Sequence, residues 1–126
     1  MQSCRIGIWI LGMAILHFQW ASGANPKDVV INEIAWMGTK ADESDEWIEL
    51  YNNTDVAINL SGWTLASVDG TPSISLSGTI PAHGYFLLER TNDNTIVDIP
   101  ADKTYTGALN DDGEWLQLKD ASGQVI

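Results

Sequence analysis

Beyond residue 24, hydrophobic and polar positions alternate in short runs, which is the pattern of β-strands. Five runs rich in β-branched and aromatic residues predict strands, at 29–35, 46–52, 63–68, 85–90 and 114–119. Clusters of Gly, Asn, Asp, Ser and Pro separate the runs and predict turns. No stretch has a sustained helical period. The pattern therefore predicts an all-β fold, a sandwich or a barrel, of a size close to the ~100 residues of immunoglobulin-like domains.

Alternation within the runs also assigns side chains to the core. Over 46–52, Ile48 and Leu50 share one face of the strand, and the other face carries polar and aromatic side chains. We place the two aliphatic residues inside, together with Ile31, Leu60, Trp63, Leu65, Phe86, Leu88, Leu116 and Leu118. A fully buried side chain of this kind contributes roughly 1.5 to 3 kcal/mol. Ten such positions make a core that does not need disulfide bonds.

The first 24 residues differ in kind from the rest. Arg5 precedes an apolar run over 6–16, and four small residues follow, ending at Ala24. This order is typical of a cleavable secretory signal, and the run is shorter than the ~20 residues that span a bilayer. An uncleaved membrane anchor is the alternative, because aromatic residues after position 16 lengthen the apolar stretch. We predict a signal peptide over 1–24 and an extracytoplasmic protein that is secreted, periplasmic or at the cell surface.

The net charge of the chain argues against one class of partner, and its cysteine content limits the chemistry that it can carry out. The chain has six Lys and Arg residues against seventeen Asp and Glu, a formal charge of -11; removing 1–24 takes Arg5 and no acid, which leaves -12. Such a surface repels phosphate backbones, so we predict no nucleic-acid binding. Cys4 is the only cysteine and would leave with the signal. The predicted mature chain, 25–126, therefore has no disulfide, no thiol chemistry and no membrane segment.

A succession of motifs resembles the bacterial lamin-tail domain family. The motifs are VINEI at 30–34, DEWIELYN at 45–52, LSGWTL at 60–65, IPAHGYFLL at 80–88 and LKDASGQVI at 118–126. The resemblance covers essentially the whole predicted mature chain and implies an immunoglobulin-like β-sandwich. In the family a further strand follows the final glycine, whereas this sequence stops three residues after Gly123. We therefore expect the lamin-tail domain over 25–126 to be cut short at its C-terminal strand, or its sheet to end early.

The resemblance also implies a function. The bacterial relatives occur in exported multidomain proteins, sometimes beside nucleases or other hydrolases, where the lamin-tail unit is the non-catalytic part. We predict an exported binding or structural module, not an enzyme, that mediates protein interaction or cell-surface assembly and has a protein or cell-envelope component as its partner. The alternative is an accessory domain of a larger exported hydrolase, such as a nuclease, whose catalytic part lies beyond residue 126.

Four polar residues are candidates for hydrolytic chemistry. Asn32 and Glu33 on the first predicted strand, with Glu46 and Glu49 on the next, could form a paired-carboxylate site. The structural reading, in which Asn32 and Glu33 bond to backbone near the strand, is the favoured one. His83 is the only histidine after the signal and lies in a predicted turn, which does not support a Ser/His/Asp constellation.

Two acidic loops are candidates for calcium, whose preferred ligands are clustered oxygens. The weak metal candidates are Asp42, Glu43, Asp45, Asp111 and Asp112. Neither loop has the spacing of an EF-hand, and Asp-Gly between strands is an ordinary hairpin signal. We favour solvated turns and predict no cofactor, with Ca²⁺ as the alternative.

Four aromatic residues are candidates for ligand contact: Trp36, Trp47, Tyr51 and Trp115. On outward faces or loops they would anchor a protein partner or stack on sugars. Packing against neighbouring loops is the structural alternative, and the sequence leaves the two open.

Overall fold

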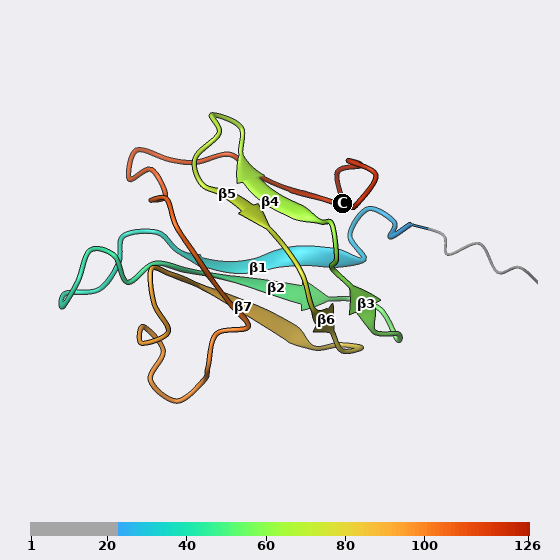
Figure 1. The fold of residues 1–126 in the computed structure, drawn as a ribbon, viewed down its shortest axis with the longest axis horizontal. Coiled ribbons are helices and arrows are strands. Elements are labelled where there is room, and N and C mark those ends of the chain that lie inside the picture. Colours follow the sequence, from blue (N-terminus) through green and yellow to red (C-terminus); the bar gives the residue numbers. More distant parts are fainter. Residues whose placement is uncertain (1–22) are drawn as a thin grey trace, which may run out of the picture.

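The computed structural model describes residues 23–126, which fold into an immunoglobulin-like β-sandwich without a helix (Figure 1). The strands are β1 (Val29–Ala35), β2 (Trp47–Asn52), β3 (Ile58–Asn59), β4 (Thr64–Ser67), β5 (Ser73–Ser75), β6 (Thr79–Ile80), β7 (Tyr85–Arg90), β8 (Lys103–Tyr105) and β9 (Leu116–Lys119). Positions 1–22 of the predicted signal peptide lie outside the described residues. In the part that is described, no helix is long and apolar enough to cross a membrane.

The strands form two main sheets and one small ladder. The larger sheet has the order β1-β2-β7-β8, the second has the order β5-β4-β9, and β3 pairs with β6. All pairs are antiparallel except β7 and β8. In Figure 1, β1, β2 and β7 lie side by side in that order. β1 is therefore one edge of the larger sheet, and β9 is one edge of the second.

The predicted strands are confirmed, and four short ones were missed. β1 and β7 have the predicted bounds, and β2, β4 and β9 lie one or two residues inside theirs. β3, β5, β6 and β8 contain only two or three residues each. So few residues cannot show a period of two convincingly, so alternation alone does not reveal such strands.

The core lies between the two sheets. Its buried members are Val29, Ile48, Leu50, Leu60, Trp63, Leu65, Ile74, Leu76, Ile80, Phe86, Leu88, Tyr105, Leu109 and Leu118. Eight of the ten side chains assigned to the core from the sequence are in this cluster. The assignment of Ile31 and Leu116 was wrong in degree, because both are only partly buried and pack against the cluster from its margin. They lie where the two sheet edges leave the sandwich open.

Two aspartates close turns with their own side chains. Asp120, after β9, accepts hydrogen bonds from the hydroxyl and the backbone N–H of Ser122 at 2.7 and 2.9 Å, and from the N–H of Gln124 at 2.9 Å. The Ser122 hydroxyl is the main cause that holds the pKa of Asp120 below its usual range. In the β4–β5 turn, the backbone N–H of Thr71, 3.0 Å from Asp69, likewise lowers the pKa of that carboxyl.

The Asp120 turn sends the chain back along β9. Val125 forms an antiparallel bridge with Lys119, and the N–H of Ile126 donates to the carbonyl of Leu118 at 3.0 Å. These bonds lie on the side of β9 that faces away from β4. Val125 and Ile126 therefore lie along the edge of β9 that β4 does not occupy.

Candidate functional site

An open groove runs between β1 and the segment that leads into β9. Its volume is about 770 Å³. Ile31 and Ile34 line it from β1, and Leu116 lines it from the start of β9. Trp36 and Trp115 stand at its sides with 41% and 81% of their surface exposed. A largely apolar groove with exposed indole rings is a candidate contact surface.

One wall of the groove is the free edge of a sheet. Within residues 23–126, β1 pairs with β2 alone. Its pairing register shifts between Ile31 and Glu33, which is a β-bulge at Asn32. Bulges and charges at sheet edges limit uncontrolled strand pairing. The edge is thus partly protected, yet it keeps backbone groups that have no strand partner in the described chain.

The opposite wall is held in place by polar contacts. The Ser67 hydroxyl donates to one oxygen of the Glu114 carboxylate, and the N–H of Asn110 donates to the other at 2.8 Å. The N–H of Val68 donates to the carbonyl of Trp115 at 2.9 Å. These bonds join the segment before β9 to the end of β4. The exposed ring of Trp115 is therefore carried by a fixed backbone, not by a free loop.

A buried ion pair supports the floor of the groove. Arg90 Nη1 lies 2.9 Å from Glu46 Oε1, and the N–H of Leu109, which lines the groove, donates to Glu46 Oε2 at 2.9 Å. Only 3% of Glu46 is exposed. The buried hydroxyl of Tyr105 has no hydrogen-bond partner among residues 23–126. Burial is the main cause that raises the pKa of Tyr105, and the negative charge of Glu46 raises it further. Glu46 was a candidate for a hydrolytic site, but in the structure its carboxylate holds Arg90 and the backbone of Leu109 in place.

The other three candidates for hydrolysis meet on the outer face of the larger sheet. Glu33 and Glu49 are direct partners in the β1–β2 register, and Asn32 Nδ2 donates to Glu49 Oε1 at 2.7 Å. Neither carboxylate has an ion-pair partner among the described residues. Like charges that face each other across a strand pair are destabilising. The pair is therefore a patch of negative potential at the side of the groove, where Asn32 and Glu33 are among the lining residues.

Comparison with known families decides the identity of the fold. The family model described as Lamin Tail Domain matches residues 22–126. This chain belongs to the lamin tail domain family. The resemblance and the immunoglobulin-like sandwich predicted from the sequence motifs are both confirmed. The lamin tail domain is in general a binding or structural module, and its family is generally non-catalytic. No curated protein matches the chain.

The lamin tail domain divides the four aromatic candidates between two surfaces. Trp36 and Trp115 share the groove, as described above. Trp47 and Tyr51 lie on the outer face of β2 and are half-buried. The ring of Tyr51 packs on Tyr85 with a centroid distance of 4.9 Å and an interplanar angle of 42°. The first of these two surfaces is hollowed by the groove.

The acidic loops of the lamin tail domain bond mainly to themselves. In the first, the hydroxyl of Thr39 donates to Asp45 at 2.5 Å, and the N–H of Ser44 donates to Asp42 at 2.7 Å. In the second, Asp111 and Asp112 are exposed to solvent. Among residues 23–126, no three His, Cys, Asp or Glu side chains lie together in a way that could hold a metal ion. The calcium hypothesis for Asp42, Glu43, Asp45, Asp111 and Asp112 gains no geometric support.

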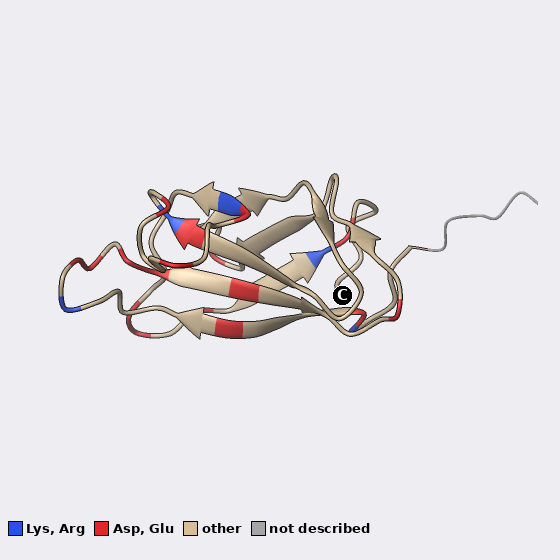
Figure 2. Cartoon of the chain, turned by 90° about the horizontal axis from the view of Figure 1, so that it is seen from below, with Lys and Arg blue, Asp and Glu red and all other residues tan. Residues whose placement is uncertain are grey.

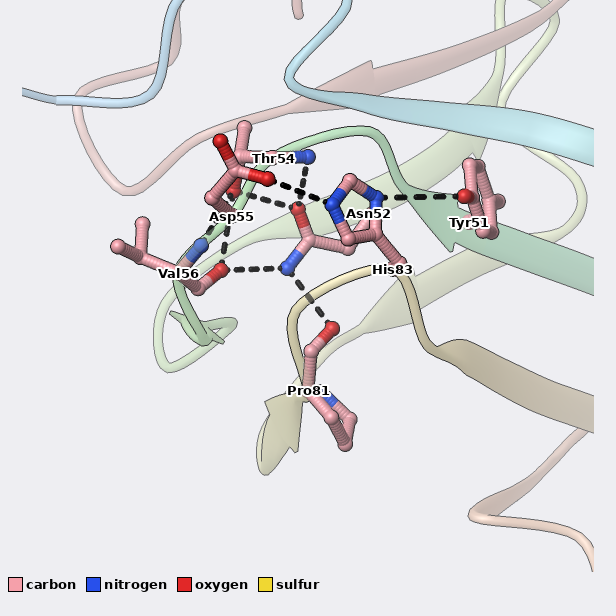
Figure 3. Close-up of polar contacts among 7 residues, drawn as sticks. All are labelled: Tyr51, Asn52, Thr54, Asp55, Val56, Pro81 and His83. Carbon is pink, nitrogen blue, oxygen red and sulfur yellow. Dashed lines mark hydrogen bonds and ion pairs between the residues drawn. The ribbon is translucent and has the colours of Figure 1, made fainter.

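A buried asparagine, which sequence reasoning missed, organises the far end of the sandwich (Figure 3). Asn52 Nδ2 donates to the carbonyls of Val56 and Pro81 at 2.8 and 2.9 Å, and its Oδ1 accepts from the N–H and hydroxyl of Thr54. The available signal was its position. It continues the inward series of Ile48 and Leu50, and a polar side chain that points inward needs partners.

His83 lies at the same end, between a carboxylate and a phenol (Figure 3). Its Nε2 is 2.7 Å from Asp55 Oδ1, and its Nδ1 is 3.5 Å from the hydroxyl of Tyr51. The Asp55 side chain is 98% exposed and that of His83 is 53% exposed. No serine hydroxyl contacts the ring among the hydrogen bonds of the described residues. The arrangement is a surface cluster that joins two turns and has no nucleophile of the kind used in acyl transfer.

Proposed function

We propose that this lamin tail domain is an exported, non-catalytic module that binds a protein or cell-envelope component. The observation that carries the proposal is the groove with Trp36 and Trp115 at its sides. Trp115 is 81% exposed, and hydrogen bonds fix the backbone that carries it. Contact with a partner would bury the ring at a small cost in conformational entropy, because the backbone is already ordered.

The arrangement of the acidic residues supports a non-catalytic role. Glu46 is committed to Arg90 and to the backbone of Leu109. Glu33 and Glu49 face each other across β1 and β2 at the side of an open groove, which does not shield a reaction from water. The arrangement of these three glutamates therefore supports a binding role better than a hydrolytic one.

Export is tested by the length of the mature chain. When the protein is expressed with its native N-terminus in a bacterial host, we expect exported material that begins at Asn25, as measured by intact mass. Ile10→Arg interrupts the apolar run and should leave an uncleaved chain in the cytoplasm. A full-length chain in the membrane fraction would show that the segment is an anchor.

The binding surface is tested by photo-crosslinking in the cells that export the chain. A photoreactive amino acid in place of Trp115 should give covalent adducts with a protein or another envelope component. The matched control places the same group at Tyr85, which is 55% exposed on the outer face of the larger sheet. Adducts of equal yield and identity from both positions would contradict a role for the groove.

A further inference from the structure

A turn that precedes β1 is tied to a carboxylate of its own. Residues 25–28 form a β-turn, in which the N–H of Asp28 donates to the carbonyl of Asn25 at 3.0 Å. The backbone nitrogen of Asn25 lies 2.6 Å from Asp28 Oδ2, and the side-chain amide nitrogen of Asn25 lies 3.2 Å from the same oxygen. One carboxylate oxygen therefore accepts from two donors of the residue at which we expect the mature chain to begin.

Contacts with a neighbouring loop hold this turn in place. Asn53 Nδ2 donates to the carbonyl of Lys27 at 2.9 Å, and the N–H of Asn53 donates to the carbonyl of Asp28 at 2.8 Å. Lys27 has a φ of 74°, a left-handed conformation that a residue with a side chain keeps only where its surroundings enforce it. The fold thus fixes the backbone that carries both the Asn25 nitrogen and the Asp28 carboxylate.

The electrostatic surroundings of the turn favour a positive charge. Two hollows flank residues 23–25, one lined by uncharged side chains of the segment 54–59 and the other by the turn after β9. Among the described residues, the charged side chains that line them are the carboxylates of Asp28 and Asp120, whereas Lys27 is exposed and lines neither. Figure 2 shows acidic residues distributed over strands and loops, with few basic residues among them. A cation between the hollows would therefore lie in a region of negative potential.

Hydrolysis of the peptide bond between Ala24 and Asn25 supplies such a cation. Water gives a hydroxyl group to the carbonyl carbon of Ala24 and a proton to the nitrogen of Asn25 as the C–N bond breaks. The new carboxylic acid then loses a proton, and the new amine gains one. Because this nitrogen already lies at hydrogen-bond distance from Asp28, the neutral hydrogen bond becomes an ion pair without movement of the turn. A cut after Gly23 would instead leave the Asn25 nitrogen as an uncharged amide.

We infer that signal peptidase cuts the bond between Ala24 and Asn25, and that the Asp28 carboxylate holds the new α-ammonium group as an ion pair at the start of the mature domain. The inference rests on the proposed export and specifies the bond that is cleaved. The pair forms only in the processed chain, so removal of the signal adds a contact that the precursor lacks. Neither residue is fully buried, so the pair should raise the ratio of folded to unfolded chain about two- to fourfold.

The processed chain can be made directly, because residues 25–126 contain every buried member of the core cluster. It is released from a fusion partner so that Asn25 is its first residue, and the α-amino group is titrated by NMR. The pKa of this group should lie about 0.5 to 1 pH unit above its value in the Asp28→Asn variant. Asp55→Asn is the matched control, because it removes a 98% exposed carboxylate nearby and should change that pKa little.

The stabilisation by the ion pair should depend on pH in one direction. An ammonium group whose pKa is raised by folding stabilises the domain at low pH, and this contribution is lost as the pH rises through the raised pKa. In urea titrations at about pH 6.5, Asp28→Asn and N-acetylation of Asn25 should each lower the midpoint of unfolding. At about pH 10, where the amine is neutral, both changes should have a much smaller effect.

Three kinds of result would overturn the inference. An α-amino pKa that is equal in the unaltered chain and in Asp28→Asn, or a midpoint at pH 6.5 that acetylation does not change, would exclude the ion pair. A higher α-amino pKa in a chain that begins at Ala24 would assign the cut to the preceding bond. Exported material that begins at a residue other than Asn25 would overturn this inference alone, whereas a full-length chain in the membrane fraction would overturn the proposed export as well.

Discussion

Replacing Trp63 with alanine is expected to lower the free energy of unfolding by about 3 to 5 kcal/mol. The side chain is 5% exposed and belongs to the core cluster between the sheets. Its backbone is bonded on both sides, from its own N–H to Leu60 and from the N–H of Leu76 to its carbonyl, at 2.9 and 2.8 Å. The chain around the lost ring can therefore relax little, and a cavity should remain.

Urea titration of the purified domain measures this change. A domain has a total stability on the order of 5 to 15 kcal/mol, so the variant should unfold at a much lower urea concentration. Trp115→Ala is the matched control, because that ring is 81% exposed and its loss should change stability by about 0.5 kcal/mol or less. A loss below about 1 kcal/mol for Trp63→Ala would show that the ring does not fill the core.

Replacing Arg90 with methionine is expected to cost about 3 kcal/mol, because it leaves the Glu46 carboxylate buried without its partner. Glu46 is 3% exposed, and the Arg90 side chain is 21% exposed. Methionine keeps much of the apolar stem and removes only the charged head, so packing is largely preserved. The N–H of Leu109 would remain as a hydrogen-bond donor to the carboxylate.

A double-mutant cycle separates this effect from a simple loss of packing. Glu46→Gln removes the charge but keeps the shape, and in the Arg90→Met background it should recover part of the lost stability. The cost should change little between low and high salt, since a buried pair is only weakly screened. Strictly additive changes in the two single variants would mean that the residues do not interact.

The alternation of side chains in the long strands predicted an all-β sandwich or barrel, and the resemblance to the lamin-tail family decided for the sandwich. Over 46–52 the alternation placed Ile48 and Leu50 inside, and both are fully buried. It was less successful at the sheet edges, where Ile31 and Leu116 point inward but the opposing layer does not cover them. The two-residue period of a strand shows which face of the sheet a side chain is on. Whether that side chain is buried depends also on the opposing sheet.

The polar interior could not be predicted in the same way, since its partners are distant in sequence. Glu46 meets Arg90 and Leu109 only through the fold. Glu89 is fully buried on the outer side of β7, where it accepts hydrogen bonds from the N–H groups of Thr95 and Ile96 at 3.0 and 2.9 Å. From the sequence alone, a glutamate next to an arginine in a strand is expected to be exposed. Glu89 is buried because the loop that carries Thr95 and Ile96 folds over it.

The residues of the candidate site could be predicted from the sequence, but their arrangement could not. Trp36 and Trp115 could be selected because tryptophans near loops are common contact residues. Their common groove could not be predicted, because it depends on β1 and β9 being edges on the same side of the sandwich. The bulge at Asn32, which sets Glu33 against Glu49, was equally hidden, since it comes from a shift in pairing.

The pairing of β4 with β9 also bears on the order of events during synthesis. It joins residues 64–67 to residues 116–119, and Leu118 of β9 enters the core. A ribosome must therefore make almost the whole described chain before the second sheet can close. Until then the nascent polypeptide lacks a complete hydrophobic core, so the domain reaches its folded state only after its last described strand has left the ribosome.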